Sequence, residues 1–128
     1  MHPDAAAKSG LTDTMLATCV PFSAIAEQVR DHLDGKHVVI YNEEYDTRLI
    51  TAEFTTCGQV APTYEARCAM QAYHKFGGRP ARQRYAGLDA ACRAEGITPQ
   101  GDAHRAPGDC LSTLALLRRM AERGRPGN

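Results

Sequence analysis

The sequence lacks most of the features that identify a function directly. Fifteen Lys and Arg residues balance fifteen Asp and Glu residues over the 128 positions, so no overall basic field points to nucleic-acid binding. No apolar run reaches the ~18 residues of a membrane span, and the opening MHPDAAAKSG has no apolar signal core. We therefore expect a cytoplasmic protein that does not enter a membrane.

Paired cysteines are also missing. The five cysteines are scattered, and no CxxC or CxxH pair occurs among them, which argues against a structural zinc site. An odd number of scattered cysteines fits a reducing compartment, where most of them serve as small buried residues. We expect packing roles for them.

What is present is an alternation of helix and strand signals over the first half of the chain. Residues 1–19 show little periodicity and are expected to form a loop with a short turn. Apolar residues at helical spacing predict a helix between Pro21 and Gly35, and the β-branched run 37–41 predicts a strand buried on both faces. A second helix is predicted over 43–54. This order is typical of an α/β domain.

The second half of the chain predicts further helices separated by polar loops. We expect a strand leading into a helix within 67–76, a helix within 84–96, and a last helix that begins at Pro107 or Gly108. One domain spanning 1–128 is expected, with 124–128 as a frayed tail. Tyr45, Leu49 and Ala52 are predicted to line one face of helix 43–54, with Ile50 and Phe54 alongside. The residues predicted to face inward on the later helices are Tyr85, Leu88, Ala91, Cys92, Cys110, Leu114, Leu117 and Met120.

Two stretches combine titratable side chains with the end of an element. Asp46 lies in the first turn of helix 43–54, just beyond the carboxyl end of strand 37–41, where ligands bind in open α/β sheets. His104 and Asp109 stand in the loop and first turn that lead into the last helix. A purely structural interpretation stays open for each, because acids favour helix N-termini and a loop histidine is more often a surface residue.

Taken together, the two stretches resemble a known family. YNEEYD at 41–46 matches the (H/Y)NxxFD motif, and HRAPGD at 104–109 matches the HxAxxD motif, of the DEDDh branch of 3′–5′ exonucleases. This DnaQ-like group includes the proofreading subunit of bacterial DNA polymerase III, and the resemblance covers about residues 9 to 121. It implies a ribonuclease-H-like α/β fold and the hydrolysis of nucleotides from a nucleic-acid 3′ end.

The resemblance also implies roles for individual residues. Asp46 and Asp109 match residues that hold two divalent ions, Mg²⁺ or Mn²⁺, and hard cations of this kind bind carboxylate oxygens. His104 matches the general base that takes a proton from the attacking water, which suits an imidazole with a pKa near ~6.5. Asn42 is expected to cap helix 43–54 and is a candidate substrate contact.

The sequence departs from the family at its first motif. In the family a DxE motif on an opening strand provides further metal-binding carboxylates, and Asp-x-Glu does not occur in this chain. We therefore expect an N-terminally truncated, helix-rich domain with a reduced sheet, whose isolated chain is inactive because two Mg²⁺ ions are short of ligands. A longer native protein, a remnant gene, a pseudonuclease and a second polypeptide that donates the strand are the open explanations.

The alternative function is a non-catalytic interaction module. Such a module would bind nucleic acid or a polymerase-like partner, and its helix-start acids would be structural only. Arg79, Arg82 and Arg84 lie in a loop that can reach the backbone of single-stranded DNA or RNA, although a solvated loop is the simpler interpretation.

Overall fold

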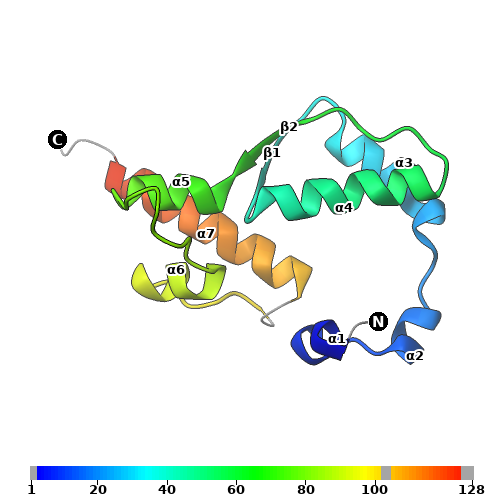
Figure 1. Cartoon of the computed structure of the whole chain (residues 1–128), viewed down its shortest axis with the longest axis horizontal. Coiled ribbons are helices and arrows are strands. Elements are labelled where there is room, and N and C mark those ends of the chain that lie inside the picture. Colours follow the sequence, from blue (N-terminus) through cyan, green and yellow to red (C-terminus); the bar gives the residue numbers. More distant parts are fainter. Residues whose placement is uncertain (1–2, 102–104, 125–128) are drawn as a thin grey trace.

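Helices account for most of the computed structural model, which describes residues 3–101 and 105–124 (Figure 1). Along the chain the elements are α1 (Pro3–Ser9), α2 (Asp13–Ala17), α3 (Phe22–Leu33), β1 (His37–Ile40), α4 (Glu43–Thr56), β2 (Glu65–Cys68), α5 (Ala69–Phe76), α6 (Leu88–Ala94) and α7 (Ala106–Gly124). The predicted mixed α/β class is confirmed. No helix in the described ranges is long and apolar enough to cross a membrane.

The start of the chain is helical, so the predicted loop over 1–19 is wrong in the described part. Helix α1 contains three alanines and no buried residue. Alanine has the highest helix propensity, and a helix that packs little leaves no apolar period in the sequence. In α2, Thr12 caps the N-terminus by accepting a hydrogen bond from the backbone N–H of Met15 at 3.2 Å.

Strands β1 and β2 are parallel, with His37 opposite Glu65 and Ile40 opposite Cys68. Helix α4 connects them and contacts both strands, which makes a βαβ unit. The prediction that the first strand is buried on both faces is wrong, since its residues alternate between exposed and half-buried and Val39 is 46% exposed. Only these two strands pair within the described residues, and the face of β1 that carries His37 and Val39 is exposed to solvent.

The turn from β1 into α4 is made by Asn42, which has a left-handed backbone with φ 61° and ψ 52°. Asparagine tolerates this region better than most residues. Its side chain makes no capping hydrogen bond, so the predicted capping role is wrong. The turn places the first residues of α4 directly beyond the carboxyl end of β1.

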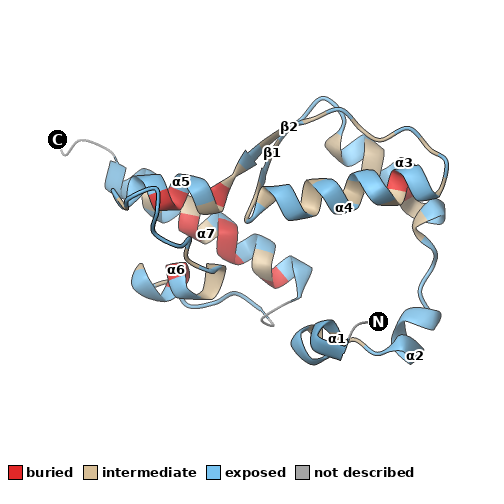
Figure 2. Ribbon diagram, in the orientation of Figure 1, coloured by how far each residue is buried: buried red, intermediate tan, exposed pale blue. Residues whose placement is uncertain are grey.

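Buried residues concentrate where α5, α6 and α7 meet (Figure 2). Tyr73, Ala91 and Leu116 form the centre of this cluster, and half-buried residues such as Tyr41 pack around it. A second contact joins α3 to α4, where the rings of Phe22 and Phe54 meet edge to face at 5.1 Å.

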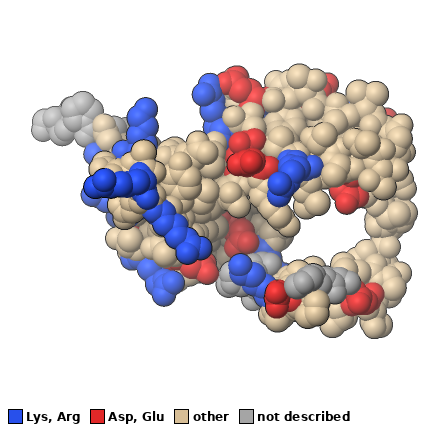
Figure 3. Space-filling view, viewed as in Figure 1, with Lys and Arg blue, Asp and Glu red and all other residues tan. Residues whose placement is uncertain are grey.

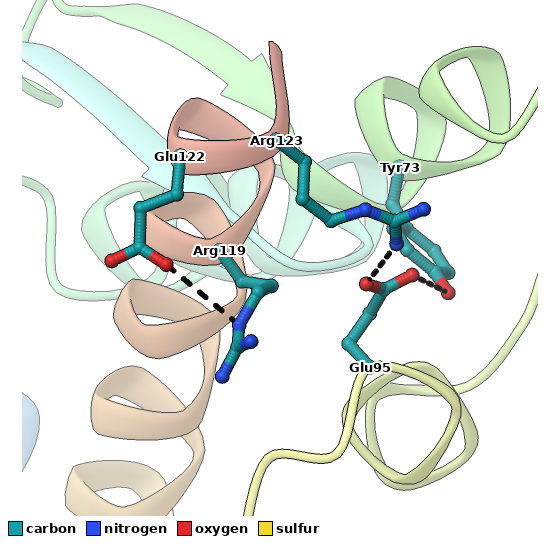
Figure 4. A network of polar contacts seen from close by, with 5 residues as sticks. All are labelled: Tyr73, Glu95, Arg119, Glu122 and Arg123. Atoms are coloured by element: carbon teal, nitrogen blue, oxygen red, sulfur yellow. Dashed lines mark hydrogen bonds and ion pairs between the residues drawn. The ribbon is translucent and has the colours of Figure 1, made fainter. Parts of the chain in front are cut away.

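A polar network closes the end of this cluster (Figure 4). The Tyr73 hydroxyl donates to Glu95 Oε1 at 3.1 Å, and Arg123 Nη1 donates to Glu95 Oε2. Arg119 and Glu122 form an ion pair at 3.9 Å on the adjoining surface of α7. Glu95 thereby links α5, the end of α6 and the end of α7.

The predicted inward faces of three helices need correction. Tyr45 and Leu49 are 54% and 47% exposed and Ala52 is exposed, whereas Phe54, predicted alongside them, is buried. Tyr85 lies before α6 and is 43% exposed, whereas Ala91 and Cys92 are buried as predicted. In α7, Cys110 and Leu114 are exposed, whereas Leu117 and Met120 are half-buried; the buried residues are Gly108, Ser112, Thr113 and Leu116.

The buried polar residues of α7 are accommodated by hydrogen bonds. Ser112 Oγ accepts from the backbone N–H of Gln100 at 3.1 Å, and Thr113 Oγ1 donates to the carbonyl of Asp109 at 2.8 Å. A prediction from hydrophobicity alone therefore assigns the wrong face of α7 to the core.

The cysteines are free thiols in the described residues, and Cys92 is the buried one among them. The expectation that most are buried is thus wrong. Of the predicted tail 124–128, Gly124 ends α7 and the remaining residues lie outside the described ranges.

Candidate active site

A cavity of about 980 Å³ lies beside the carboxyl end of β1, where the starts of α4, α6 and α7 come together. The end of β1 contributes Tyr41 and Asn42 to its lining, and Asp46 follows from the first turn of α4. Asp109 and Thr113 of α7 also line it. The position agrees with the general tendency of α/β sheets to bind ligands beyond their strands' carboxyl ends.

Asp46 is half-buried in this lining. Burial raises the pKa of its carboxyl group, because partial removal from water disfavours the charged form, and a backbone hydrogen bond within Asp46 opposes this in part. No cationic side chain pairs with it among the described residues. A bound cation would therefore stabilise the ionised carboxylate.

Asp109 is held in the first turn of α7 by its backbone. Its N–H donates to the carbonyl of Arg105 at 3.0 Å, and its own carbonyl accepts from Thr113 Oγ1. The carboxylate is half-buried at the cavity wall. The fold thus brings Asp46 and Asp109, from two distant segments, into one cavity.

The other predicted site residues differ in whether they line the cavity and in whether the structure describes them. Asn42 lines the cavity, whereas His104 lies outside the described residues. Arg79, Arg82 and Arg84 do not line the cavity and belong to the loop between α5 and α6.

Three further charged residues line the cavity and were missed from the sequence: Lys8, Asp89 and Arg93. Asp89 carries the same signal as Asp109, an acid in the first turn of a helix, and could have been found by that rule. Lys8 and Arg93 have no local signal, because only the fold brings them to the cavity.

Tyr41 connects the cavity to the loop before α6. Its hydroxyl donates to the carbonyl of Ala86 at 2.6 Å. Burial is the main reason that the pKa of Tyr41 is raised to about 12, which keeps the phenol protonated, and therefore a hydrogen-bond donor, well into the alkaline range.

The two motif carboxylates, Asp46 and Asp109, both line the cavity. Mg²⁺ is commonly bound by one or two carboxylates, with water and substrate phosphate as its other ligands. In residues 3–101 and 105–124, no three His, Cys, Asp or Glu side chains form a group that could hold a metal ion. The described residues therefore do not complete a two-metal site.

Comparison with known sequences decides the family. The profile of the RNase_T exonuclease family matches residues 1–117. The chain belongs to this exonuclease family. The DnaQ-like resemblance predicted from the two motifs is thereby confirmed.

Two relatives of this exonuclease-family chain are similar along much of its length. The uncharacterized exonuclease CP81 of Escherichia phage 186 is 33% identical over 94% of the chain, which covers 67% of the phage protein. DNA polymerase III subunit epsilon of Pasteurella multocida is 33% identical over 76% of the chain, and the aligned part is 38% of that subunit.

Proposed function

We propose that this exonuclease-family chain binds the 3′ end of a single-stranded nucleic acid in the cavity, and that Asp46 and Asp109 together hold Mg²⁺ or Mn²⁺ against the terminal phosphodiester. The observation that carries the proposal is that the two carboxylates line the same cavity although they come from different helices. A cation held there supplies Lewis-acid stabilisation of the negative charge that develops on the phosphate oxygens.

The remaining roles are assigned to three other residues. His104, which precedes Asp109 closely in the sequence, is proposed as the base that would take the proton from the attacking water once further ligands complete the metal site. The amide of Asn42, in the cavity lining, can hydrogen-bond the terminal nucleotide. Tyr41 acts as a positioning residue, because its hydrogen bond to Ala86 fixes the adjoining wall.

A second candidate function, a non-catalytic module that binds nucleic acid or a polymerase-like protein, is favoured by one specific observation. The sequence contains no Asp-x-Glu, and the described ranges contain no group of three His, Cys, Asp or Glu side chains that could hold a metal ion. The similarity to a polymerase III subunit supports a polymerase-like protein as the partner in either case.

The test combines turnover with binding. A 5′-labelled single strand of DNA or RNA is incubated with the 128-residue chain and Mn²⁺, and the products are separated on a gel. We expect no measurable turnover, because two carboxylates leave a two-metal set incomplete. Mn²⁺ should nevertheless tighten binding of a strand with a free 3′ end, and Asp109→Asn should remove that effect.

The matched control is Asp31→Asn, which removes an exposed carboxylate of α3 that has no partner in the described part of the chain. This variant should keep the Mn²⁺ effect. If Mn²⁺ leaves binding unchanged in the parent chain, the cation role of Asp46 and Asp109 is wrong and the non-catalytic module is the better account. Ready degradation of the strand would show instead that the two carboxylates suffice.

A further inference from the structure

The loop between α5 and α6, residues 77–87, has a local positive charge, although the net charge of the whole chain is zero. We refer to it as the basic loop. It contains Arg79, Arg82 and Arg84, and no Asp or Glu occurs between Glu65 and Asp89. Figure 3 shows basic side chains gathered over the end of the molecule where α5, α6 and α7 lie. Such a patch attracts polyanions.

The three arginines of the basic loop are not equivalent. The guanidinium of Arg79 lies over the ring of Tyr73, 4.8 Å from its centroid, and the residue is half-buried. Arg82 and Arg84 are exposed, and neither has a hydrogen-bond or ion-pair partner among the residues that the structure describes. Arg79 therefore has a packing role, whereas Arg82 and Arg84 are available to a ligand.

Several contacts hold the basic loop in one conformation. His74 Nε2 is hydrogen-bonded to the carbonyl of Pro80 at 3.0 Å, and the same carbonyl accepts from the backbone N–H of Gln83 at 2.8 Å. The rings of His74 and Tyr85 meet edge to face at 4.7 Å. A loop that is already ordered loses less entropy when it binds a ligand.

The basic loop ends at the cavity. Ala86 accepts the hydrogen bond of Tyr41, and Gly87 is part of the cavity lining. Arg84 lies three positions before Gly87, so their backbones are separated by at most ~10 Å. A strand whose 3′ end occupies the cavity can therefore reach the loop.

We propose that the basic loop binds the phosphate backbone of the same single strand through Arg82 and Arg84, adjacent to the nucleotides in the cavity. The inference rests on the proposed function for the direction of the strand. Tyr85, which follows Arg84 in the sequence, is 43% exposed, and an exposed aromatic ring beside arginine suits a nucleic-acid base better than an acidic peptide. Arginine pairs with phosphate through two parallel hydrogen bonds.

The test measures binding of the full 128-residue chain to a short fluorescein-labelled oligothymidylate by fluorescence anisotropy, with EDTA present and over a series of salt concentrations. The double variant Arg82→Gln, Arg84→Gln should weaken binding about tenfold at low salt. The slope of log affinity against log salt should become shallower by about 1.4, because two phosphate contacts are lost. An oligouridylate probe should give the same pattern, since the contact is with the backbone.

The control variant Arg48→Gln, Arg118→Gln removes the same charge from two exposed arginines on α4 and α7 that have no partner in the described ranges. It should leave affinity and slope close to those of the parent. Equal weakening by both variants, or no weakening by the first, would overturn the proposal. Tighter binding of polyglutamate than of the oligonucleotide would overturn it too, in favour of an acidic protein ligand.

Because EDTA removes the cation, this measurement is independent of Asp46 and Asp109. If the Arg82 and Arg84 variant loses affinity but Mn²⁺ has no effect on the parent chain, the strand-binding role of the basic loop is supported and the proposed cation role of Asp46 and Asp109 is contradicted. If that variant keeps its affinity and Mn²⁺ tightens binding by the parent chain, the proposed function is supported and the strand leaves the cavity without contacting the basic loop.

Discussion

Replacing Tyr41 by Phe removes one hydroxyl at the point where β1, the cavity and the basic loop meet. That hydroxyl donates to Ala86 O at 2.6 Å, while the ring packs against the Tyr73, Ala91 and Leu116 cluster. Phe keeps the ring, so the packing is retained and only the hydrogen bond is lost. Its loss, with the half-buried carbonyl left partly unpaired, should lower the free energy of unfolding by about 1–2 kcal/mol at neutral pH.

The same substitution has a pH signature. Burial raises the pKa of Tyr41 from 10.0 to about 12 in the folded state. Because the folded pKa is the higher one, the stability from this group is fully present below about pH 10 and is lost as the pH rises to about 12. The ring is only half-buried, so solvent screening limits this contribution to about 1–2 kcal/mol.

The assay is urea unfolding followed by circular dichroism, with the parent and Tyr41→Phe compared from neutral pH to about pH 12. The difference between the two proteins cancels the titration of every other group. We expect the parent's advantage at neutral pH to decline towards zero between about pH 10 and about pH 12. Equal stability at neutral pH, or a difference that stays constant throughout, would refute the reasoning.

Two further substitutions test the packing around this region. Leu116→Ala should lower the free energy of unfolding by about 2–5 kcal/mol, because Leu116 is fully buried. The control is Leu111→Ala, at a residue that is 53% exposed. A urea midpoint of Leu116→Ala no lower than that of the control would contradict the place of Leu116 in the core. The hydrogen bond from Arg123 is the main reason that the pKa of Glu95 is lowered from its ordinary value of 4.5. The stabilisation from this group is therefore present above the unfolded pKa and is lost as the pH falls through the folded value. Because the Arg123 side chain is 58% exposed, Glu95→Gln should cost only about 1 kcal/mol at neutral pH and less in acid, and a cost that does not change with pH would be inconsistent with this account.

The order of the elements was largely predictable because its signals are local. Pro21 stands at the N-cap position before α3, and Gly35 follows its end with φ +68°, a conformation that glycine adopts at little cost. The β-branched run before Asn42 forms β1. Such signals depend on a few neighbouring residues, which is why the bounds of α3 and β1 agree closely with the prediction.

The faces of α4 and α7 were not predictable in the same way. The buried side of α4 is set by the contact of Phe54 with Phe22, which belongs to another helix. In α7, Ser112 and Thr113 are buried because hydrogen bonds satisfy their hydroxyl groups, while the larger Leu114 is exposed. A count of apolar residues in the sequence identifies neither a packing partner on another helix nor the hydrogen-bond partners of buried hydroxyl groups.

The candidate site was predictable in its residue types but not in its extent. Asp46 and Asp109 were singled out by motif position, and both line the cavity. Arg93 and Lys8 were missed, because distant segments have to fold before either reaches that wall. The packing of Arg79 on Tyr73 likewise separates it from Arg82 and Arg84, although the sequence presents the three arginines alike.

Mn²⁺ binding to the 128-residue chain tests most directly whether Asp46 and Asp109 hold one cation between them. Free Mn²⁺ is followed by electron paramagnetic resonance during titration of the parent, Asp46→Asn, Asp109→Asn and the double variant. Because both carboxylates are proposed to share the ion, each single substitution should remove most of the affinity, and the double variant should lose little more. Binding that survives either single substitution, or losses that simply add, would contradict the shared site.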